Sequence, residues 1–281
     1  GAYDKALALY PEDALAWIQA AHPEAWKKLT DMHGANAGKQ VLDRLVKELE
    51  SQGTLAILRH GFKMVGLGEK RLSMAQFKPA FALNPDTLAR YGANRLRVVE
   101  EVHYSQHKAD RIDLVFFVNG LPVATSELKT DSTQSVYDAI KQYQDDRPPI
   151  DPVAKVSEPL LAFKTRCVVH FAVSTSKVAM ATRLEGASTV FLPFDQGFDE
   201  GAGNPPNPKG CPTAYLWERV LQRDAWLHIL GSFVHLERKP KKLPDGRKIT
   251  VESLIFPRFH QWDAVLKLVE AARTDGGGHT Y

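Results

Sequence analysis

Hydrophobic residues recur with a helical period at the start of the chain and with a period of two in its middle. The apolar residues within 41–49 recur at helical spacing, and Gly53 follows them where a C-terminal cap is expected. Pro11 and Pro23, each followed by acidic residues, are typical of the first turn of two earlier helices. These patterns predict a helical lead-in over residues 1–60.

The middle of the chain has the composition of β-strands. Residues 97–104 and 112–118 are rich in Val, Ile, Phe and Tyr, which favour strands. Asn119-Gly120 is a strong signal for a hairpin turn, so residues 121–129 should form the returning strand. The remaining expected elements are a helix ending at Pro148-Pro149, strands over 168–174 and 189–194, a helix over 215–230, a strand over 249–256 and a helix over 262–272.

This order of elements predicts an α/β protein in which helices flank a mixed central sheet. We expect a core over residues 61–196, followed over 197–281 by a loop, helices and a connector, all within one structural domain. With 281 residues, of which 44% are apolar, the chain can bury a core without disulfides or structural metal. It has two cysteines, no long apolar run and no signal-peptide pattern, so we expect a cytoplasmic protein without membrane contact.

Charge is nearly balanced, at a formal +3 for the whole chain, apart from one basic run. Residues 238–248 hold six basic residues and one acid, together with Pro and Asp-Gly, which are typical of a mobile loop. In one interpretation Lys239, Lys241 and Lys242 contact DNA phosphates. In the other, given equal weight, the run is a solvated loop.

Three charged residues interrupt the two apolar strands around Asn119-Gly120. They are Asp113, Glu127 and Lys129, and a charge buried alone in a strand costs several kcal/mol, so a compensating partner is expected. A divalent cation such as Mg²⁺ prefers carboxylate oxygens, and a neighbouring lysine can orient the attacking water.

The hairpin register decides whether the two acids can meet. A regular two-residue turn would pair Asp113 with Ser126 and turn Glu127 to the opposite face. A one-residue offset pairs Asp113 with Glu127, and Pro122, which cannot donate to the ladder, favours such an irregularity. We therefore predict the offset, although the spacing alone fits a salt-bridged edge hairpin equally well.

Longer strings around these residues resemble the N-terminal nuclease region of the R (HsdR) subunit of type I restriction-modification enzymes. The matching strings are residues 77–80, 83–85, 91–96, 111–129, 138–147, 257–265 and 277–281, which together span most of the chain. The resemblance implies a PD-(D/E)xK restriction-endonuclease-like core, which is a Mg²⁺-dependent phosphodiesterase.

The resemblance also implies roles for individual residues. Asp113 and Glu127 match the catalytic, metal-binding acids, with the backbone carbonyl of Leu128 as a further ligand, and Lys129 matches the catalytic lysine. The proline that precedes the first acid in the family is replaced by Ile112.

The family also has a Gln-x-x-x-Tyr element on the following helix. Tyr143 matches its tyrosine, whereas Ala139 stands at the glutamine position and Gln142 could substitute for it. Gln142 and Tyr143 are therefore candidate DNA or active-site contacts.

The implied partners are double-stranded DNA and the modification (M) and specificity (S) subunits. ATP would bind only in motor domains that this sequence lacks, because it contains no G-x-x-x-x-G-K-[ST] loop. We expect residues 277–281 to approach the first motor strand of a longer protein. Two alternatives stay open, namely a stand-alone PD-(D/E)xK repair nuclease and a non-catalytic DNA-binding or docking module.

Overall fold

A computed structural model describes residues 1–79, 81 and 83–275, so the expected connector at 277–281 lies outside the described residues. The α-helices are α1 (Pro11–Ala21), α2 (Pro23–His33), α3 (Ala37–Gln52), α4 (Thr54–His60), α5 (Pro85–Ala93), α6 (Val136–Asp146), α7 (Arg223–His228) and α8 (Phe259–Asp275). The strands are β1 (Phe62–Lys63), β2 (Arg71–Leu72), β3 (Leu96–His103), β4 (Arg111–Val118), β5 (Leu121–Leu128), β6 (Val169–Val173), β7 (Val178–Ala181), β8 (Leu192–Pro193), β9 (His235–Lys242) and β10 (Lys248–Ile255).

The predicted helical lead-in is present as α1–α4. Pro11 and Pro23 occupy the first turns of α1 and α2, where the missing N–H of proline has no intrahelical partner to lose. Gly53 ends α3 with a φ of 87°, a conformation that a side chain would strain.

The central sheet has six strands in the order β3-β4-β5-β6-β7-β8. Strands β5 and β6 run parallel, and the other neighbouring strands are antiparallel. A parallel pair needs a long crossover, and α6 supplies it, packing against both β5 and β6. The predicted α/β class, with helices flanking a mixed central sheet, is therefore confirmed.

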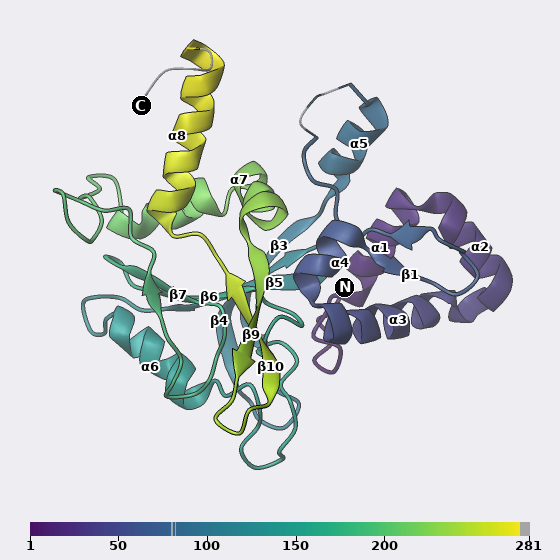
Figure 1. Ribbon diagram of the computed structural model, residues 1–281, viewed down its shortest axis with the longest axis horizontal. Coiled ribbons are helices and arrows are strands. Elements are labelled where there is room, and N and C mark those ends of the chain that lie inside the picture. The colour runs from purple at the N-terminus through teal and green to yellow at the C-terminus, as the bar shows by residue number, and fades with distance from the viewer. Residues whose placement is uncertain (80, 82, 276–281) are drawn as a thin grey trace.

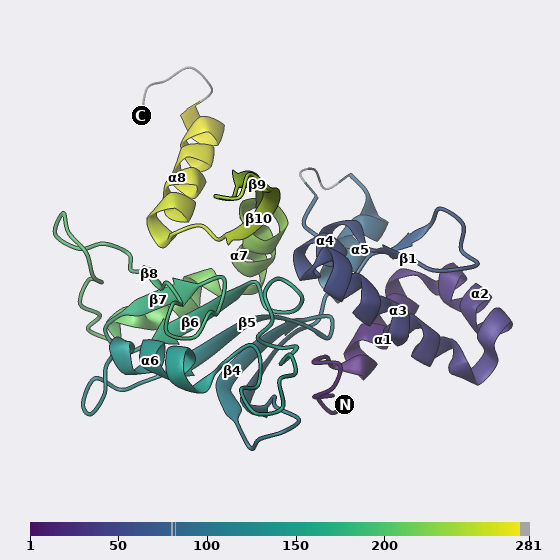
Figure 2. The same ribbon diagram turned by 60° about the horizontal axis from the view of Figure 1, so that its bottom comes forward.

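The helices cover different parts of this sheet (Figures 1 and 2). Helix α6 lies along the sheet beside β5 and β6, whereas α1–α4 gather near the turn that joins β4 to β5. The largest hydrophobic core includes Trp17 of α1, Phe171 of β6 and Trp262 of α8. The lead-in, the sheet and the C-terminal segment therefore share one core.

Some expected elements differ from the structure. The helix expected over 215–230 is interrupted, with a π-helical turn at Leu216–Val220 before α7 and another at Ile229–Phe233 after it. The strand expected over 189–194 shortens to β8, and β7 was not predicted. Of the loop expected over 238–248, residues 238–242 belong to β9 and Lys248 begins β10, so only residues 243–247 form the turn between these two strands.

Helix α8 has 17 residues and projects from the body of the molecule in both ribbon views (Figures 1 and 2). Its middle turns expose Val265, Leu268 and Val269. Among the described residues, no helix combines the length and the apolar character needed to cross a membrane.

Candidate active site

The hairpin of β4 and β5 has the predicted one-residue offset. Asn119 and Gly120 form a two-residue turn with φ values of 48° and 82°, and Val118 pairs with Leu121. The register then shifts between Phe116 and Phe117.

The extra residue of this bulge is Val123. Phe117 pairs with Pro122, whereas Phe116 already pairs with Ala124, so Val123 has no partner on β4. The pairing of Leu114 with Ser126 continues the new register and places Asp113 opposite Glu127. The offset therefore comes from a bulge beside Pro122.

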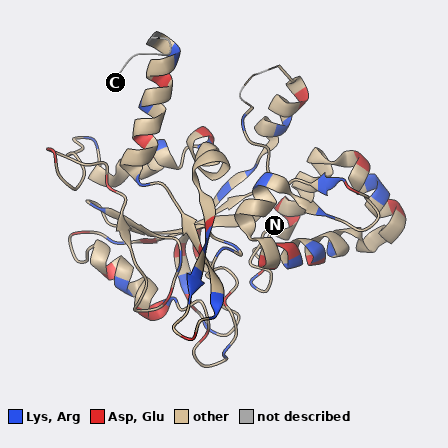
Figure 3. Ribbon diagram, in the orientation of Figure 1, with Lys and Arg blue, Asp and Glu red and all other residues tan. Residues whose placement is uncertain are grey.

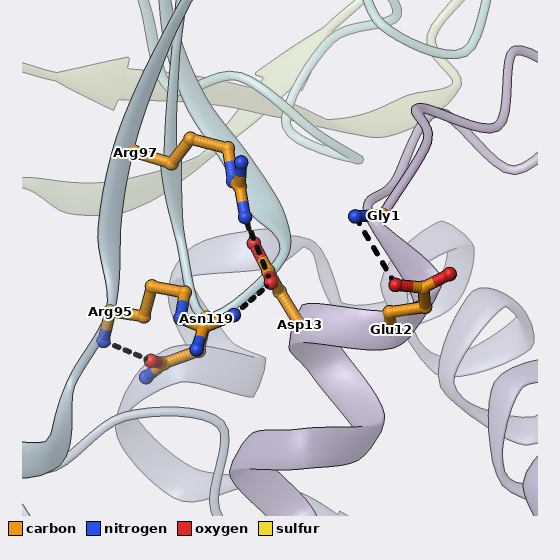
Figure 4. Close-up of polar contacts among 6 residues, drawn as sticks. All are labelled: Gly1, Glu12, Asp13, Arg95, Arg97 and Asn119. Atoms are coloured by element: carbon orange, nitrogen blue, oxygen red, sulfur yellow. Dashed lines mark hydrogen bonds and ion pairs between the residues drawn. The ribbon is translucent and has the colours of Figure 1, made fainter.

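Helix α1 holds the turn end of this hairpin in place. Buried Asp13 accepts hydrogen bonds from Arg95 Nη1 at 2.5 Å and from Arg97 Nε at 2.8 Å (Figure 4). The backbone N–H of Arg95 donates in turn to Asn119 Oδ1 at 2.7 Å. The Tyr10 N–H donates to the Gly120 carbonyl at 2.9 Å, so α1 contacts the turn directly.

The two acids lie together but in different environments. Asp113 is partly exposed, and its Oδ2 accepts a hydrogen bond from the Leu128 N–H at 2.7 Å. Glu127 is completely buried, and its Oε2 has no hydrogen-bond partner among the described residues. Burial raises the pKa of Glu127 to about 8, the charge of Asp113 raises it further, and the Arg147 guanidinium opposes both.

Arg147 is a residue of this site that the sequence analysis missed. Its Nε donates to Glu127 Oε1 at 2.8 Å, and both side chains are almost completely buried. A buried strand acid needs a compensating partner, for which the sequence suggested a metal ion, and the structure supplies this arginine directly after α6.

Lys129 follows the end of β5, two residues after Glu127, and is partly exposed. Its backbone N–H donates to the Val173 carbonyl of β6 at 2.8 Å, which fixes the chain at this point. Its side chain lines an open pocket of about 330 Å³ together with residues of α6, including Gln142 and Asp138. Lys129 therefore lies at an accessible surface beside α6, in a pocket that neither Asp113 nor Glu127 lines.

The two candidate contacts on α6 differ in accessibility. Gln142 lines the pocket of Lys129, and its Oε1 is buried with no partner in the part of the chain that the structure describes. Tyr143, the other candidate DNA or active-site contact, is completely buried and is not open to DNA at the surface of this structure. Its hydroxyl lies 2.8 Å from Thr125 Oγ1, which lies 2.7 Å from His170 Nδ1.

This buried network of Tyr143, Thr125 and His170 ties α6 to β5 and β6. Thr125 lies two residues before Glu127 and so points to the same face of β5. Burial lowers the pKa of His170 to about 3, so the imidazole is neutral at physiological pH. Tyr143 therefore ties α6 to the face of β5 that carries Glu127.

The residues around Glu127 suit a hard divalent cation. Two carboxylates on one face, one with an unpartnered buried oxygen, are the donors that Mg²⁺ prefers. No group of three or more His, Cys, Asp or Glu side chains is arranged for a metal within the described residues 1–79, 81 and 83–275. A site here would therefore need ligands of another kind, and the Leu128 carbonyl stays a predicted one.

The basic residues of the run 238–248 lie on a different sheet from the acids. Lys239, Lys241 and Lys242 are exposed on β9, and the ribbon of this hairpin is coloured blue for Lys and Arg over part of its length in Figure 3. Lys239 Nζ lies 2.9 Å from Glu237 Oε2. Pro240 pairs with Thr250 within the ladder, where the proline had suggested a loop.

Comparison with known families identifies the chain. The family model described as Type I restriction enzyme R protein N terminus matches residues 19–189, which is more than half of the chain and includes Asp113, Glu127 and Arg147. No curated protein matches the sequence. The chain therefore belongs to the family formed by the N-terminal region of type I restriction enzyme R proteins.

Proposed function

We propose that this chain is the Mg²⁺-dependent endonuclease region of a type I restriction enzyme R subunit and hydrolyses phosphodiester bonds of double-stranded DNA. The observation that carries the proposal is the bulge at Val123, which places Glu127 opposite Asp113. Without it, the period of the strand would turn Glu127 to the other face of the sheet.

Asp113, Glu127 and the Leu128 carbonyl would hold the metal. Bound Mg²⁺ would lower the pKa of a water molecule and neutralise charge on the phosphate. Glu127 must be ionised to act as a ligand, and its pKa of about 8 means that it releases a proton as it takes up this role. The Leu128 N–H orients the Asp113 carboxylate through its 2.7 Å hydrogen bond.

Lys129 supplies the positive charge on the open side of the site. Its ammonium lines the pocket beside α6, where it can donate to a phosphate oxygen or orient the attacking water. Gln142 lines the same pocket and stays a candidate DNA contact, since its Oε1 lacks a partner in the described structure.

The wider context of the reaction also belongs to this proposal. Membership of the R protein family supports cleavage after ATP-driven translocation by motor domains, within a cytoplasmic assembly that includes the M and S subunits. It also favours a restriction enzyme over a stand-alone repair nuclease. The buried carboxyl of Glu127 favours an active enzyme over a docking module, because binding alone does not require a buried carboxylate.

We propose in addition that Lys239, Lys241 and Lys242 contact DNA phosphates without reading sequence. All three are exposed on β9 of the two-stranded β9–β10 hairpin. Phosphate contacts of this kind strengthen binding through counterion release.

The proposal is tested by cleavage with the complete restriction assembly carrying Lys129→Ala or Asp113→Ala. We expect Mg²⁺-dependent cleavage to fall by roughly a hundredfold or more, with ATP hydrolysis retained. Lys47→Ala, an exposed lysine on α3, is the matched control and should cleave normally. Undiminished cleavage by either site variant would refute the assignment.

A further inference from the structure

Arg147 is a buried arginine whose charge is matched by a single carboxylate. It is 8% exposed, and Glu127 is its only ion-pair partner among the residues described. The Nε atom donates to Glu127 Oε1 at 2.8 Å, and Nη1 donates to the carbonyl of Asp146 at 3.3 Å. A buried guanidinium needs such a partner, so the two side chains fix each other.

The hydrogen bond from Arg147 engages one carboxylate oxygen of Glu127 and leaves the other without a partner among the described residues. Oε1 is occupied by Arg147, whereas Oε2 is buried with no donor within the described chain. A carboxylate held in this way cannot rotate freely, because rotation would break a buried, charge-assisted hydrogen bond.

The backbone around Arg147 is also held in place. Arg147 follows the last residue of α6, and Pro148-Pro149 restrict the chain after it. The Pro149 carbonyl accepts the Glu158 N–H at 2.9 Å. The Glu158 carboxylate in turn accepts the Ser105 hydroxyl at 2.6 Å, in the loop that precedes β4.

We propose that Arg147 is a positioning residue of the metal site: it holds Glu127 Oε1, so that Oε2 is the single oxygen that Glu127 offers to a divalent cation. This inference rests on the proposed function, since it assumes that Glu127 is a metal ligand. Arg147 acts through Glu127 and contacts neither metal nor DNA. Residues that orient metal ligands in this way typically change metal affinity by about 10- to 100-fold.

The test is a titration of the DNA-free chain with Mn²⁺, in which free Mn²⁺ is measured by electron paramagnetic resonance. We expect Arg147→Met to weaken Mn²⁺ binding by about 10- to 100-fold. Arg147→Lys should also bind more weakly than the wild type, because an ammonium lacks the planar fork of donors that fixes a carboxylate. Full affinity in Arg147→Lys would overturn the positioning role.

Arg238→Met is the matched control. Arg238 Nε lies 2.9 Å from Glu252 Oε1 on the β9–β10 hairpin. The substitution therefore removes an Arg–Glu pair of similar geometry from the surface. We expect its Mn²⁺ affinity to equal that of the wild type. Circular dichroism of each variant shows whether it is folded.

A double variant separates positioning from general support of the fold. Arg147→Met leaves Glu127 buried without a counter-charge, whereas Glu127→Gln with Arg147→Met removes both charges and avoids that cost. If Arg147 acts through Glu127, the double variant binds Mn²⁺ as weakly as Glu127→Gln alone. A further loss in the double variant would overturn the inference.

The same titration distinguishes the two proposals. If Glu127→Gln leaves Mn²⁺ affinity unchanged, Glu127 is not a ligand and the proposed function fails with the inference. If Glu127→Gln weakens binding and Arg147→Met does not, only the role of Arg147 is refuted.

Discussion

Two antiparallel hairpins carry the charged residues that the sequence analysis selected, and they place these charges in opposite environments. The β4–β5 hairpin lies within the six-stranded sheet, and Glu127 on it is completely buried. The β9–β10 hairpin forms a separate two-stranded sheet whose lysines are exposed (Figure 3). The degree to which these charges are buried therefore distinguishes the candidate catalytic site from the basic surface more clearly than the number of charges does.

A glutamate on each hairpin pairs with an arginine at nearly the same distance, Glu127 with Arg147 at the end of α6 and Glu252 with Arg238 of β9. Arg147 and Glu127 approach to 2.8 Å with side chains 9% and 0% exposed, whereas Arg238 and Glu252 approach to 2.9 Å with 60% and 24% exposed. Water screens the second pair and leaves the first unscreened. The same chemistry should therefore have very different consequences in the two places.

The largest expected effect is on stability, when each arginine is replaced in turn. Arg147→Ala should lower the free energy of unfolding by about 3–5 kcal/mol, because it leaves a buried carboxylate unpaired. Arg238→Ala should lower it by about 1 kcal/mol or less, since Glu252 keeps a second partner in Lys164. Urea unfolding of both variants measures the difference, and equal losses would contradict it.

The turn glycines give the second comparison. Gly120 has a φ of 82° and Gly246 a φ of 86°, so alanine strains the backbone at both positions. A Cβ at Gly120 would also collide with the Tyr10 carbonyl of the lead-in, whereas one at Gly246 meets open space. We expect losses of roughly 2–4 kcal/mol for Gly120→Ala and about 1 kcal/mol for Gly246→Ala. Thermal unfolding compares them, and similar losses would show that α1 does not constrain the turn.

The third comparison is how the free energy of unfolding of the metal-free protein depends on pH. Burial raises the pKa of Glu127 from 4.5 to about 8, so the folded state holds a proton that the unfolded state has lost. This stabilisation is complete below pH 4.5 and disappears as the pH rises toward 8, by at most about 1.4 kcal/mol per pH unit.

Glu127→Gln should remove this decline from the stability profile. Glu252→Gln provides the contrast, because the hydrogen bond from Lys164 lowers the pKa of Glu252 and its stabilisation is lost instead at acidic pH. Urea unfolding between pH 4.5 and 8 measures both variants, and in this range Glu252→Gln should keep the decline of the wild type. A decline that persists in Glu127→Gln would show that another group causes it.

The smallest effect on stability is expected at the basic hairpin. Replacing Lys239, Lys241 and Lys242 by alanine should change the free energy of unfolding by less than about 0.5 kcal/mol. The slope of log affinity for DNA against log salt should fall by about 1 for each lysine that contacts a phosphate.

The matched control for this triple variant replaces Lys27, Lys28 and Lys47, which are exposed on α2 and α3. Salt-dependent binding to a DNA duplex measures both slopes. An unchanged slope in the hairpin variant would favour the other interpretation, a solvated hairpin without contact to DNA.

The register of the β4–β5 hairpin could be predicted because it depends on local signals. Asn119-Gly120 specifies the turn, and Pro122 cannot donate to the ladder, so an irregularity beside it is favoured. The alternation of the strand then fixes which face carries each acid. The acid pair could therefore be located from the sequence.

Other features depend on contacts between distant segments. Arg147 reaches Glu127 only because the crossover through α6 returns the chain beneath β5, and no spacing in the sequence encodes that contact. Tyr143 matched a family motif, but its depth in the core depends on packing against Thr125 and Phe191. Strand β9 was missed because its lysines and Pro240 lack the usual apolar alternation of a strand.

The most direct test of the acid pair as a metal site is anomalous X-ray diffraction from crystals of this chain soaked in Mn²⁺. The account predicts an anomalous peak in contact with Glu127 Oε2 and the Asp113 carboxylate, while Arg147 stays on Glu127 Oε1. Crystals that show no peak between the two acids, or that show Mn²⁺ bound elsewhere with both carboxylates unligated, would contradict it.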